Sequence, residues 1–587
     1  MIVPVFTRCM LMAALLLSAT AHAQDITSVP GEAAWTGKAS AAPAWRAPAG
    51  ADGPASRIVF RELPVARIVE LEDHNAQGAL KPTQVGVARL ASDDALVELP
   101  PLRWSSVPGG AVARIEAHSP DALALRVGLR VSGLDPRVEL RFAGSDNLAK
   151  VVARVDGEEA TRLAGDRRVY WTPVTDGERQ VIELFAPAGV DTGAIQVAVP
   201  EVSHLVTNSQ RGFSLAKIGE SESCNVDTAC RVAALGANFV NAKNAVARMI
   251  FTDGGTFTCT GTLLNDTVPA TQLAYFYTAN HCISTQAVAS TLLTFWGYEA
   301  TSCGSGVQAA NIQLTGGAQY LYSSDAGNNP NAPAGTDAAL LRLNGTPPNG
   351  AFFAGWDAAP LAASSSVLAI HHPSGDVKKS SLGQQMSSNA QVNFVAWTSG
   401  TTEGGSSGSG LFTSSGSGYA LRGGLWGGSA SCANSGSVNT AANRDWYSRL
   451  DVAYPSIQQY LAPGAAGAGP TRNNGGLWYV PSESGWGLTA FQFAAPGNVL
   501  FVTWYAYGAN GQPMWYQIDG SWTGTDVNSG PVRRYAGPTW GTSFNPAQVS
   551  YANVGTATLT FTSATSATLE YTVDGVSRTV TLSKIGG

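Results

Sequence analysis

Charged residues are scarce in this chain, and no block of basic residues interrupts it. Charged side chains make up 13% of the 587 residues, and the formal net charge is −6. Proteins that bind nucleic acid usually cluster lysine and arginine to neutralise phosphates. The composition therefore predicts no nucleic-acid partner.

The chain also has no apolar run long enough for a permanent membrane anchor. The run Met10–Leu17 is shorter than the roughly 20 residues that span a bilayer. Arg8 precedes it, and Ala21-His22-Ala23 after it has the small-x-small pattern of a signal-peptide cleavage site. We predict that residues 1–23 are a signal peptide and that the product is secreted, extracellular and free of a membrane anchor.

Cysteine is missing from both flanking parts of the mature chain. Apart from Cys9 in the predicted signal peptide, all six cysteines lie between Cys224 and Cys432. An even number of cysteines in an exported protein indicates disulfides. A zinc site is the alternative, but it would need closely spaced Cys and His pairs, which these spacings do not provide.

Long stretches of helical periodicity are scarce, whereas short apolar runs between Gly, Asn and Ser turns are frequent. This pattern predicts a mainly β protein of several domains. We expect a β-sandwich-like domain in a pro-region over residues 24–217, an antiparallel barrel region over 218–461, a Gly/Ala/Pro linker over 462–470, and a Trp-rich β domain over 471–587. The alternative for residues 24–217 is an accessory domain that the mature protein retains.

The last domain contains a hairpin signal and many aromatic residues. Asn510-Gly511 separates two strand-like runs, a typical hairpin turn. The stretch Ser484–Leu488 resembles a Trp-rich C-terminal domain that occurs on many secreted bacterial hydrolases. Its tryptophans either form the core or form a platform for a polysaccharide or other surface; they are Trp478, Trp486, Trp504, Trp515, Trp522 and Trp540.

The chemistry is expected in a glycine- and serine-rich stretch, Thr401–Phe412. Read alone, such a run is usually a linker. Glycines also let the backbone turn tightly and bring N–H groups to a substrate carbonyl, where they stabilise an oxyanion. The rest of the chain favours the second interpretation, in which this stretch carries a nucleophilic serine.

A nucleophilic serine needs a base and a carboxylate that orients the base. His281 ends an apolar run and is followed by Cys282, whereas His371 and His372 lie much nearer Ser407 in the sequence. Asp337 opens the apolar run Ala338–Leu343; an aspartate there is often only a turn residue. His281 and Asp337 are therefore the candidates for the base and for the carboxylate that orients it.

These motifs resemble those of chymotrypsin-like serine peptidases. Gly405–Ser409 resembles their G-D-S-G-G, and Thr278–Cys282 resembles T-A-A-H-C. Across residues 220–461 the chain resembles the lysyl endopeptidase group in particular, through the motifs Ser223–Asp227, Gly355–Asp357, Ile370–Pro373, Phe394–Trp397 and Thr402–Ser409. The resemblance implies a double antiparallel β-barrel, a catalytic triad of His281, Asp337 and Ser407 in the family's order, and an oxyanion hole made by the N–H groups of Gly405 and Ser407. It also implies three disulfides: Cys224–Cys432, Cys230–Cys303 and Cys259–Cys282.

The resemblance implies a basic specificity as well. Asp445 stands where the lysyl endopeptidase group carries an aspartate at the base of the substrate pocket, and a desolvated carboxylate there favours Lys or Arg. The alternative is that Asp445 pairs with Arg444 or Arg449 at the surface. Trp397 matches an aromatic residue beside the active site, and Trp426 stands where the group has a histidine. This last difference leaves the choice between Lys and Arg open.

Maturation is expected to remove the pro-region. Ser406 replaces the aspartate that pairs with the new N-terminus in trypsin-like enzymes, so Cys224–Cys432 is expected to tether the N-terminal segment instead. A lysine-specific enzyme could cut itself after Lys217.

The sequence thus predicts a secreted serine endopeptidase that acts on proteins or peptides after a basic residue. It needs no metal or organic cofactor, and we expect a monomer. The alternatives are a serine peptidase of other specificity, and a surface-binding protein with a vestigial protease fold.

Overall fold

The computed structural model describes residues 27–35, 43–47, 55–76, 82–164, 168–209, 220–268, 271–416, 418–463, 473–493, 499–508, 511–523, 526–539 and 548–585. The predicted signal peptide, Lys217 and most of the predicted linker lie outside these residues. Strands dominate, so the predicted mainly β class is confirmed. No described helix has the length and apolar character that crossing a membrane requires. The chain divides into two compact units, one that holds Thr27–Gly464 and one that holds most of the later residues.

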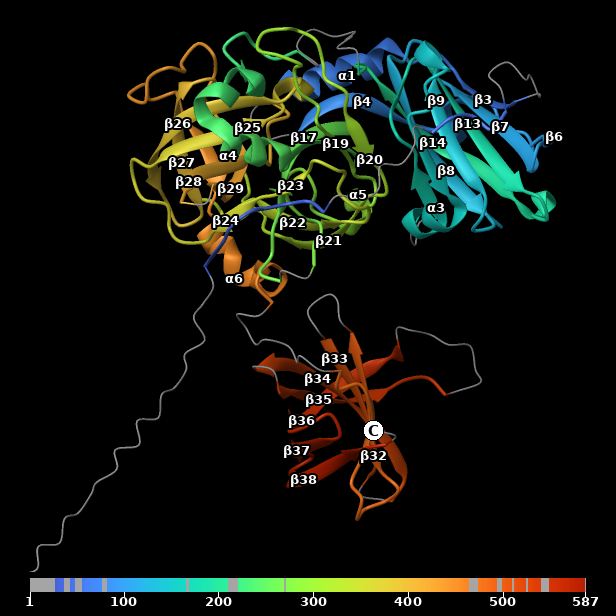
Figure 1. The fold of residues 1–587 in the computed structure, drawn as a ribbon, viewed down its shortest axis with the longest axis vertical. Helices are drawn as coiled ribbons and strands as arrows, with labels where there is room; N and C mark the ends of the chain where they lie inside the picture. The colour runs from blue at the N-terminus through green and yellow to red at the C-terminus, as the bar shows by residue number, and fades with distance from the viewer. Residues whose placement is uncertain are drawn as a thin grey trace, which may run out of the picture. The chain divides into compact units, whose positions relative to one another are not determined.

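The N-terminal domain is a β-sandwich with one helix on each of two flanks (Figure 1). Its first sheet contains β3 (Ser56–Phe60), β5 (Ala95–Val97), β6 (Ser105–Val107), β7 (Gly110–His118), β9 (Glu139–Gly144), β10 (Ala153–Asp156) and β13 (Arg179–Pro187). Its second sheet contains β4 (Thr83–Leu90), β8 (Ala124–Ser132), β11 (Val169–Trp171), β12 (Thr175–Asp176) and β14 (Gln196–Leu205). Helices α1 (Val65–Ala76) and α3 (Gly157–Ala164) lie on these flanks, and the four-residue helix α2 (Ala91–Asp94) directly follows β4.

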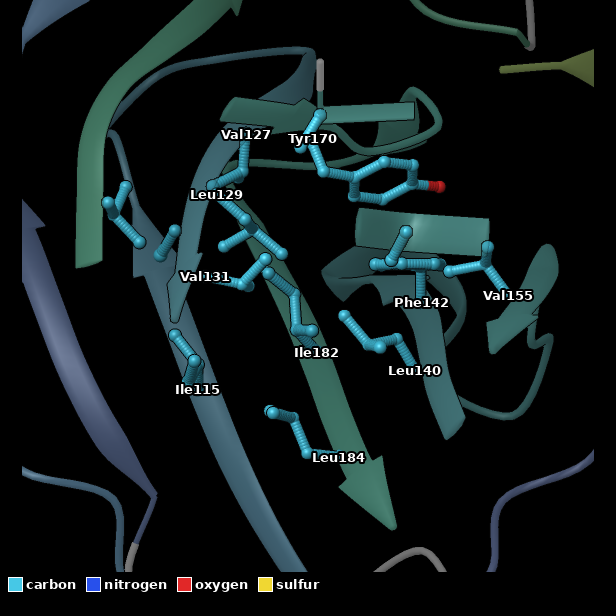
Figure 2. Packing of buried hydrophobic residues seen from close by; sticks show 14 of the residues in the cluster. Ile115, Val127, Leu129, Val131, Leu140, Phe142, Val155, Tyr170, Ile182 and Leu184 are labelled. Carbon is cyan, nitrogen blue, oxygen red and sulfur yellow. The ribbon is translucent and has the colours of Figure 1, made fainter. Parts of the chain in front are cut away.

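The sandwich core forms because alternate residues of both sheets point inward. Figure 2 shows Ile115 of β7 and Ile182 of β13 packing toward Leu129 of β8. All three side chains are fully buried, and each such burial contributes about 1.5–3 kcal/mol to folding. The sandwich therefore has a hydrophobic core of its own.

The region after residue 220 contains two β layers. The first is an antiparallel sheet of β16 (Val246–Thr252), β17 (Thr256–Leu264), β18 (Tyr275–Ala279), β19 (Leu293–Trp296), β20 (Ile312–Leu314), β21 (Ala318–Ser323) and β22 (Ala338–Leu343). Strand β4 of the sandwich pairs with β17, so this layer and the second sheet of the sandwich form one 12-stranded sheet.

The second layer closes on itself because β29 pairs with both β28 and β30. Its strands are β25 (Ser366–His371), β26 (Lys379–Ser388), β27 (Val392–Ser399), β28 (Gly410–Ser415), β29 (Gly418–Gly428) and β30 (Asp445–Ser448). Strand β24 (Gly355–Asp357) adds to β29 in parallel, and β1 (Ser28–Val29) adds to β24. The helix α6 (Leu450–Leu461) follows β30.

The second compact unit is a closed eight-stranded antiparallel barrel. Its strands are β31 (Gly476–Tyr479), β32 (Gly487–Phe493), β33 (Val499–Tyr507), β34 (Pro513–Thr523), β35 (Val527–Ala536), β36 (Ser550–Phe561), β37 (Ser566–Val573) and β38 (Val576–Lys584). The predicted hairpin joins β33 to β34, and Gly511 has a φ of +73°, which glycine adopts readily. Trp478, Trp504 and Trp522 are in the barrel core, whereas Trp515 is exposed.

Candidate active site

Strand pairing brings His281 next to Asp337. Strand β18 ends at Ala279, which pairs with Ala338 at the start of β22. His281 lies two residues after β18, and Asp337 directly precedes β22. The disulfide between Cys282 and Cys259 of β17 holds the histidine loop against the neighbouring strand. Two adjacent strand ends therefore present an imidazole and a carboxylate to each other.

The carboxylate of Asp337 makes two contacts with His281. Oδ2 lies 2.7 Å from Nδ1 of the ring, and Oδ1 accepts the backbone N–H at 3.0 Å. Asp337 is 3% exposed and has a φ of +61°, a conformation that L-residues adopt rarely. Burial raises the pKa of this carboxyl above its usual value, and the neighbouring His281 opposes the rise. The contacts fix the ring orientation and leave Nε2 as the reactive nitrogen.

Ser407 lies in a tight turn between Thr401 and β28. Within the turn Ser406 N–H donates to the Glu403 carbonyl, and Gly408 N–H donates to the Leu425 carbonyl. Among the described residues, the N–H groups of Gly405 and Ser407 have no such acceptor. Gly405 has a φ of +85°, and a side chain there would come within 2.8 Å of the His372 carbonyl. The turn therefore needs glycine and leaves two N–H groups available for an oxyanion.

Ser407 lies beside β17, which pairs with β18, and makes no direct hydrogen bond to the His281 ring. The Ser407 carbonyl accepts the N–H of Thr260, the residue after Cys259, at 2.8 Å. Nε2 of His281 is buried and has no hydrogen-bond partner among the described residues. Hydrogen bonds between a nucleophile and its base are often long in the absence of substrate.

Asp445 lies in a cavity of about 300 Å³ that Ser407 also lines. Leu425 and Gly427 of β29 form one wall, and Thr402 and Gly404 form another. The next residue of β29, Gly428, cannot carry a side chain, because a Cβ atom there would lie 1.7 Å from Oδ1 of Asp445. The Ser407 side chain and a buried carboxylate thus share one cavity.

Three donors hold the Asp445 carboxylate, and one of them is the backbone N–H of Ala430, which lies 3.4 Å from Oδ1. Oδ2 of the carboxylate accepts the indole N–H of Trp397 at 2.5 Å and the hydroxyl of Thr402 at 2.7 Å. Burial raises the pKa of Asp445 to about 6, against the effect of these hydrogen bonds. Arg444 instead donates to the carbonyls of Thr440 and Asn443, and Arg449 pairs with Asp451. The carboxylate therefore has no cationic partner among the described residues.

The two tryptophans that the sequence singled out lie away from the cavity surface. Trp397 is fully buried, packs edge-on against Tyr447 and reaches Asp445 with its N–H. Trp426 is 1% exposed, packs against Trp446, and is not among the residues that line the cavity. Trp397 thus contacts the cavity through its hydrogen bond to Asp445.

The other two histidines of this region are buried structural groups. Nδ1 of His371 lies 2.8 Å from the Ser406 hydroxyl, and burial lowers its pKa to about 3. Nδ1 of His372 lies 3.0 Å from the Asp376 carbonyl, and burial lowers its pKa well below the usual value. Both rings are therefore neutral over the physiological range.

Sequence reasoning missed several residues of the cavity. Thr402 was noticed only as part of a motif, although its hydroxyl holds Asp445. Four residues of the N-terminal domain also line the cavity: His74, Asn75, Pro82 and Thr83. No local pattern marks them, because their position depends on how the two domains pair.

The described cysteines form three disulfides, Cys224–Cys432, Cys230–Cys303 and Cys259–Cys282. Two clusters of potential metal ligands occur among the described residues, one at His281 and one at Glu403. Every cysteine in these clusters belongs to a disulfide, so none offers a thiolate to a metal.

Comparisons with known proteins give consistent matches over most of the chain. A family model described as lysyl endopeptidase, C-terminal domain, matches residues 218–448, and one described as lysyl endopeptidase N-terminal domain matches residues 59–206. A lysyl endopeptidase of Pseudomonas aeruginosa is 35% identical over 482 residues, which are 78% of this chain and 99% of the relative.

Two crystal structures of the M. tuberculosis protease Rv3671c in an inactive form, one of them a mutant, also match. They are 12% and 14% identical and cover 39% of this chain and 92% of the other, with a TM-score of 0.23. This score is too low to support any inference about the fold or the site.

Proposed function

The chain belongs to the lysyl endopeptidase family and is a peptidase, and from this premise we propose that it is a secreted serine endopeptidase that cuts after a basic residue. The observation that carries the proposal is the shared cavity of Ser407 and Asp445. A buried carboxylate without a cationic partner beside a serine in a glycine-rich turn suits a substrate whose side chain carries a positive charge.

In this proposal His281, Asp337 and Ser407 act as a triad. Nε2 of His281 takes the proton of the Ser407 hydroxyl as Oγ attacks the scissile carbonyl, and it returns the proton to the leaving amine. Asp337 holds Nδ1–H and stabilises the imidazolium. Water then hydrolyses the acyl-enzyme. The contact of 2.7 Å between Nδ1 and Oδ2 supports these roles.

We assign the oxyanion hole to the N–H groups of Gly405 and Ser407. Among the described residues no acceptor occupies either group, whereas the N–H groups of Ser406 and Gly408 bind carbonyls of the protein. Preorganised donors of this kind typically contribute a factor of about 10²–10³ each to turnover.

Specificity in this proposal resides in Asp445, held by Trp397 and Thr402. A lysine or arginine side chain before the scissile bond would enter the cavity and supply the missing cation. Trp426 packs behind β29 against Trp446, so its effect on the choice between Lys and Arg would be indirect.

Residues 1–23 would direct export, and residues 24–217 would form a pro-region that maturation removes. The family model of the N-terminal domain ends at residue 206, and that of the C-terminal domain begins at residue 218, directly after Lys217. Three disulfides fit an oxidising compartment. N-terminal sequencing of the secreted enzyme tests cleavage after Lys217, and a start far from Ile218 would contradict it.

The experiment that tests the function uses matched peptides that differ only in the residue before the scissile bond: Lys, Arg, Glu or Ala. We expect turnover of the Lys peptide, or of the Lys and Arg peptides, and none with Ser407→Ala. Turnover of the Glu or Ala peptide instead would favour a serine peptidase of another specificity. No turnover by correctly processed protein would favour a binding protein with a vestigial protease fold.

A second function is favoured by the outer surface of the C-terminal barrel, which carries a row of aromatic rings on four neighbouring strands. Tyr505 pairs with Trp515 across β33 and β34, and Trp515 stacks on Tyr535 of β35 with centroids 5.3 Å apart. Tyr551 of β36 continues the row at 5.7 Å from Tyr535. Tyr505, Trp515 and Tyr551 are 53%, 47% and 57% exposed.

Exposed apolar patches of this kind usually mark a binding surface, and we propose that this row binds the faces of sugar rings in a polysaccharide. Pull-down of full-length Ser407→Ala protein on insoluble polysaccharide should show binding that Trp515→Ala abolishes. The exposed Val576 lies on another strand pair, so Val576→Ala is the matched control. Equal binding by both variants would contradict the proposal.

A further inference from the structure

The side chain of Glu403 joins three segments of the catalytic region. Glu403 lies four residues before Ser407, in the turn that carries it. Its Oε1 accepts the backbone N–H of Glu222 at 3.0 Å and also the side-chain amide of Asn225. Its Oε2 accepts the hydroxyl of Ser374 at 2.8 Å. One carboxylate therefore binds three donors that come from other parts of the chain.

Ser374 fixes the peptide group that contains the Gly405 N–H. The backbone N–H of Ser374 donates to the Gly404 carbonyl at 2.5 Å. The Gly404 carbonyl and the Gly405 N–H belong to one planar trans peptide group, so they point in opposite directions. A hydrogen bond that fixes the carbonyl on one side therefore directs the N–H to the other side.

The conformation of Ser374 is itself unusual and needs support. Its φ is +53°, in the left-handed region that L-residues adopt rarely, and its side chain is buried. Gly405 packs directly on this turn, since a Cβ atom on it would lie 3.0 Å from the Gly375 nitrogen and 3.3 Å from the Ser374 nitrogen. The hydrogen bond from the Ser374 hydroxyl to Glu403 holds the turn in place. Glu403 thus supports the Gly405 N–H through Ser374.

The Ser407 N–H has a separate support. It shares a peptide group with the Ser406 carbonyl, which accepts the Ser409 N–H at 2.9 Å. This hydrogen bond lies within the turn and does not involve the Glu403 side chain. Of the two N–H groups that we assign to the oxyanion hole, only that of Gly405 therefore depends on this carboxylate.

Residues 221–225 support the Glu403 carboxylate from outside the turn. Besides the two donors to Oε1, Ser221 of this segment donates its hydroxyl to Oδ2 of Asp376 at 2.8 Å, next to the supporting turn. The disulfide Cys224–Cys432 fastens the segment. The donors to Oε1 are a backbone N–H and a side-chain amide, so they hold the carboxylate without a positive charge.

We propose that Glu403 is a positioning residue for the oxyanion hole and that docking of residues 221–225 keeps it in place. The first segment of the catalytic region thereby controls the direction of the Gly405 N–H. The inference rests on the proposed function, because it assumes that this N–H binds the oxyanion. The contacts are all present in the uncut chain, so the hole forms without a new N-terminal ammonium group.

The first test separates kcat from KM in the processed enzyme with a Lys peptide. Glu403→Ala should lower kcat by about 10²-fold, because loss of one oxyanion donor costs about 10²–10³-fold. KM should stay nearly unchanged, because Asp445 keeps its donors. Glu403→Gln keeps an oxygen for Glu222 and Asn225 and presents an amide to Ser374, so its kcat should recover to within about tenfold of wild type.

Glu403 also lines the cavity, whereas Ser374 is not among the lining residues. Ser374→Ala removes only the hydroxyl, and it should lower kcat about tenfold with KM unchanged. Glu220 is exposed and directly precedes residues 221–225, so Glu220→Ala is the matched control, for which wild-type kinetics are expected. A wild-type kcat in Ser374→Ala would overturn the support through Ser374.

A peptide aldehyde that ends in Lys tests the oxyanion hole directly. Ser407 Oγ adds to the aldehyde carbon, its proton passes to His281, and the carbonyl oxygen becomes the oxyanion. The inhibition constant of the aldehyde should rise about 10²-fold in Glu403→Ala. That of butylammonium, which pairs with Asp445 and forms no oxyanion, should stay the same. Equal rises for both inhibitors would show a general effect on the cavity and would overturn the positioning role.

Asn225→Ala tests the contribution of residues 221–225. It should lower kcat about tenfold in the wild-type background and should have no further effect in Glu403→Ala, because both changes break the same link. Equal effects in the two backgrounds would overturn that link. Normal turnover that is insensitive to Glu403→Ala would overturn this inference alone, whereas no turnover by processed wild-type protein would overturn the proposed function with it.

Discussion

The hydroxyl of Ser406 lies 2.8 Å from Nδ1 of His371, and Nε2 of the same ring lies 3.1 Å from the hydroxyl of Ser381. All three side chains are buried. Because Ser406 directly precedes Ser407, a neutral hydrogen-bond chain supports the turn that carries the nucleophile. Trypsin-like enzymes have an aspartate at the position of Ser406, so here the support requires no charge.

The first prediction concerns the acid sensitivity of this chain. Burial lowers the pKa of His371 from 6.5 to about 3. Between pH 3 and pH 6.5 the unfolded chain binds a proton that the folded protein excludes. The stability that comes from the neutral His371 ring is therefore complete above pH 6.5 and is lost as the pH falls toward 3. One such group contributes about 1.4 kcal/mol per pH unit.

Urea unfolding of Ser407→Ala protein measures this dependence. A His371→Asn variant on that background cannot take up the proton, so its free energy of unfolding should fall less steeply with acidification. Parallel slopes for the two proteins would contradict this role of His371.

Asp337→Asn should lower kcat by about 10⁴-fold and leave KM nearly unchanged. The amide can no longer hold His281 with Nδ1–H toward it, so Nε2 loses the tautomer that accepts a proton. Steady-state kinetics of the processed enzyme measure the loss. Asp325 is exposed in the preceding loop, and Asp325→Asn is the matched control, for which normal kinetics are expected.

Asp445→Asn should remove the preference for basic residues. Truncating one partner of a buried charge pair costs about 2–5 kcal/mol, so kcat/KM for a Lys peptide should fall by about 10²–10³-fold. The value for an Ala peptide should change little, because that side chain does not reach the carboxylate. An unchanged ratio between the two peptides would place the specificity elsewhere.

The free energy of unfolding of Asp445→Asn should not fall as the pH rises, unlike that of the wild type. Burial raises the pKa of Asp445 from 3.8 to about 6. The contribution of the protonated carboxyl to folding stability is therefore complete below pH 3.8 and is lost as the pH rises through 6. Above pH 6 the protein holds an ionised, buried carboxylate. Asp445→Asn should therefore be more stable than wild type by about 1–3 kcal/mol near pH 8, as measured by denaturant unfolding of the unliganded protein.

The disulfide Cys224–Cys432 joins residues 208 positions apart. Nearby, Asn225 and the N–H of Glu222 bind Oε1 of Glu403, in the turn before Ser407. Replacing both cysteines by alanine should cost about 5 kcal/mol of unfolding free energy. It should also lower turnover of the folded enzyme, since the segment that holds Glu403 is no longer tied to the second layer.

The control for this prediction is the disulfide Cys230–Cys303, which joins residues 73 positions apart. Its removal should cost slightly less stability and leave turnover of the folded protein unchanged. Equal turnover for both double variants would show that Cys224–Cys432 acts on stability alone.

The sequence pattern predicted the parts of the fold that depend on residues close together in the sequence. Alternating apolar runs gave the β class, and Asn510-Gly511 marked the hairpin between β33 and β34. Asp337 was predicted because it opens an apolar run and falls between His281 and Ser407 in the family's order. Each of these depends on residues near in sequence or on a motif with a fixed order.

Contacts between strands that lie far apart in the sequence could not be predicted in this way. The hydrogen bond from Thr402 to Asp445 spans 43 residues, and the pairing of β4 with β17 joins two domains. A strand edge has the same backbone donors and acceptors whatever its sequence, so alternation does not reveal which edge it meets. The helix α1 was also missed, because its apolar face is completed by β4 and not by its own neighbours.

The 12-stranded sheet crosses the border between the sandwich and the catalytic region, and this affects both parts after the proposed removal of the pro-region. The proposed removal of the pro-region would uncover two unpaired strand edges, β4 on the sandwich and the start of β17 on the catalytic region. Open edges are templates for aggregation unless they are covered. Substrate chains can cover β17 in turn, but the detached sandwich has no comparable occupant for β4. The released domain should therefore be the short-lived product, prone to self-association and open to digestion by the enzyme that it had covered.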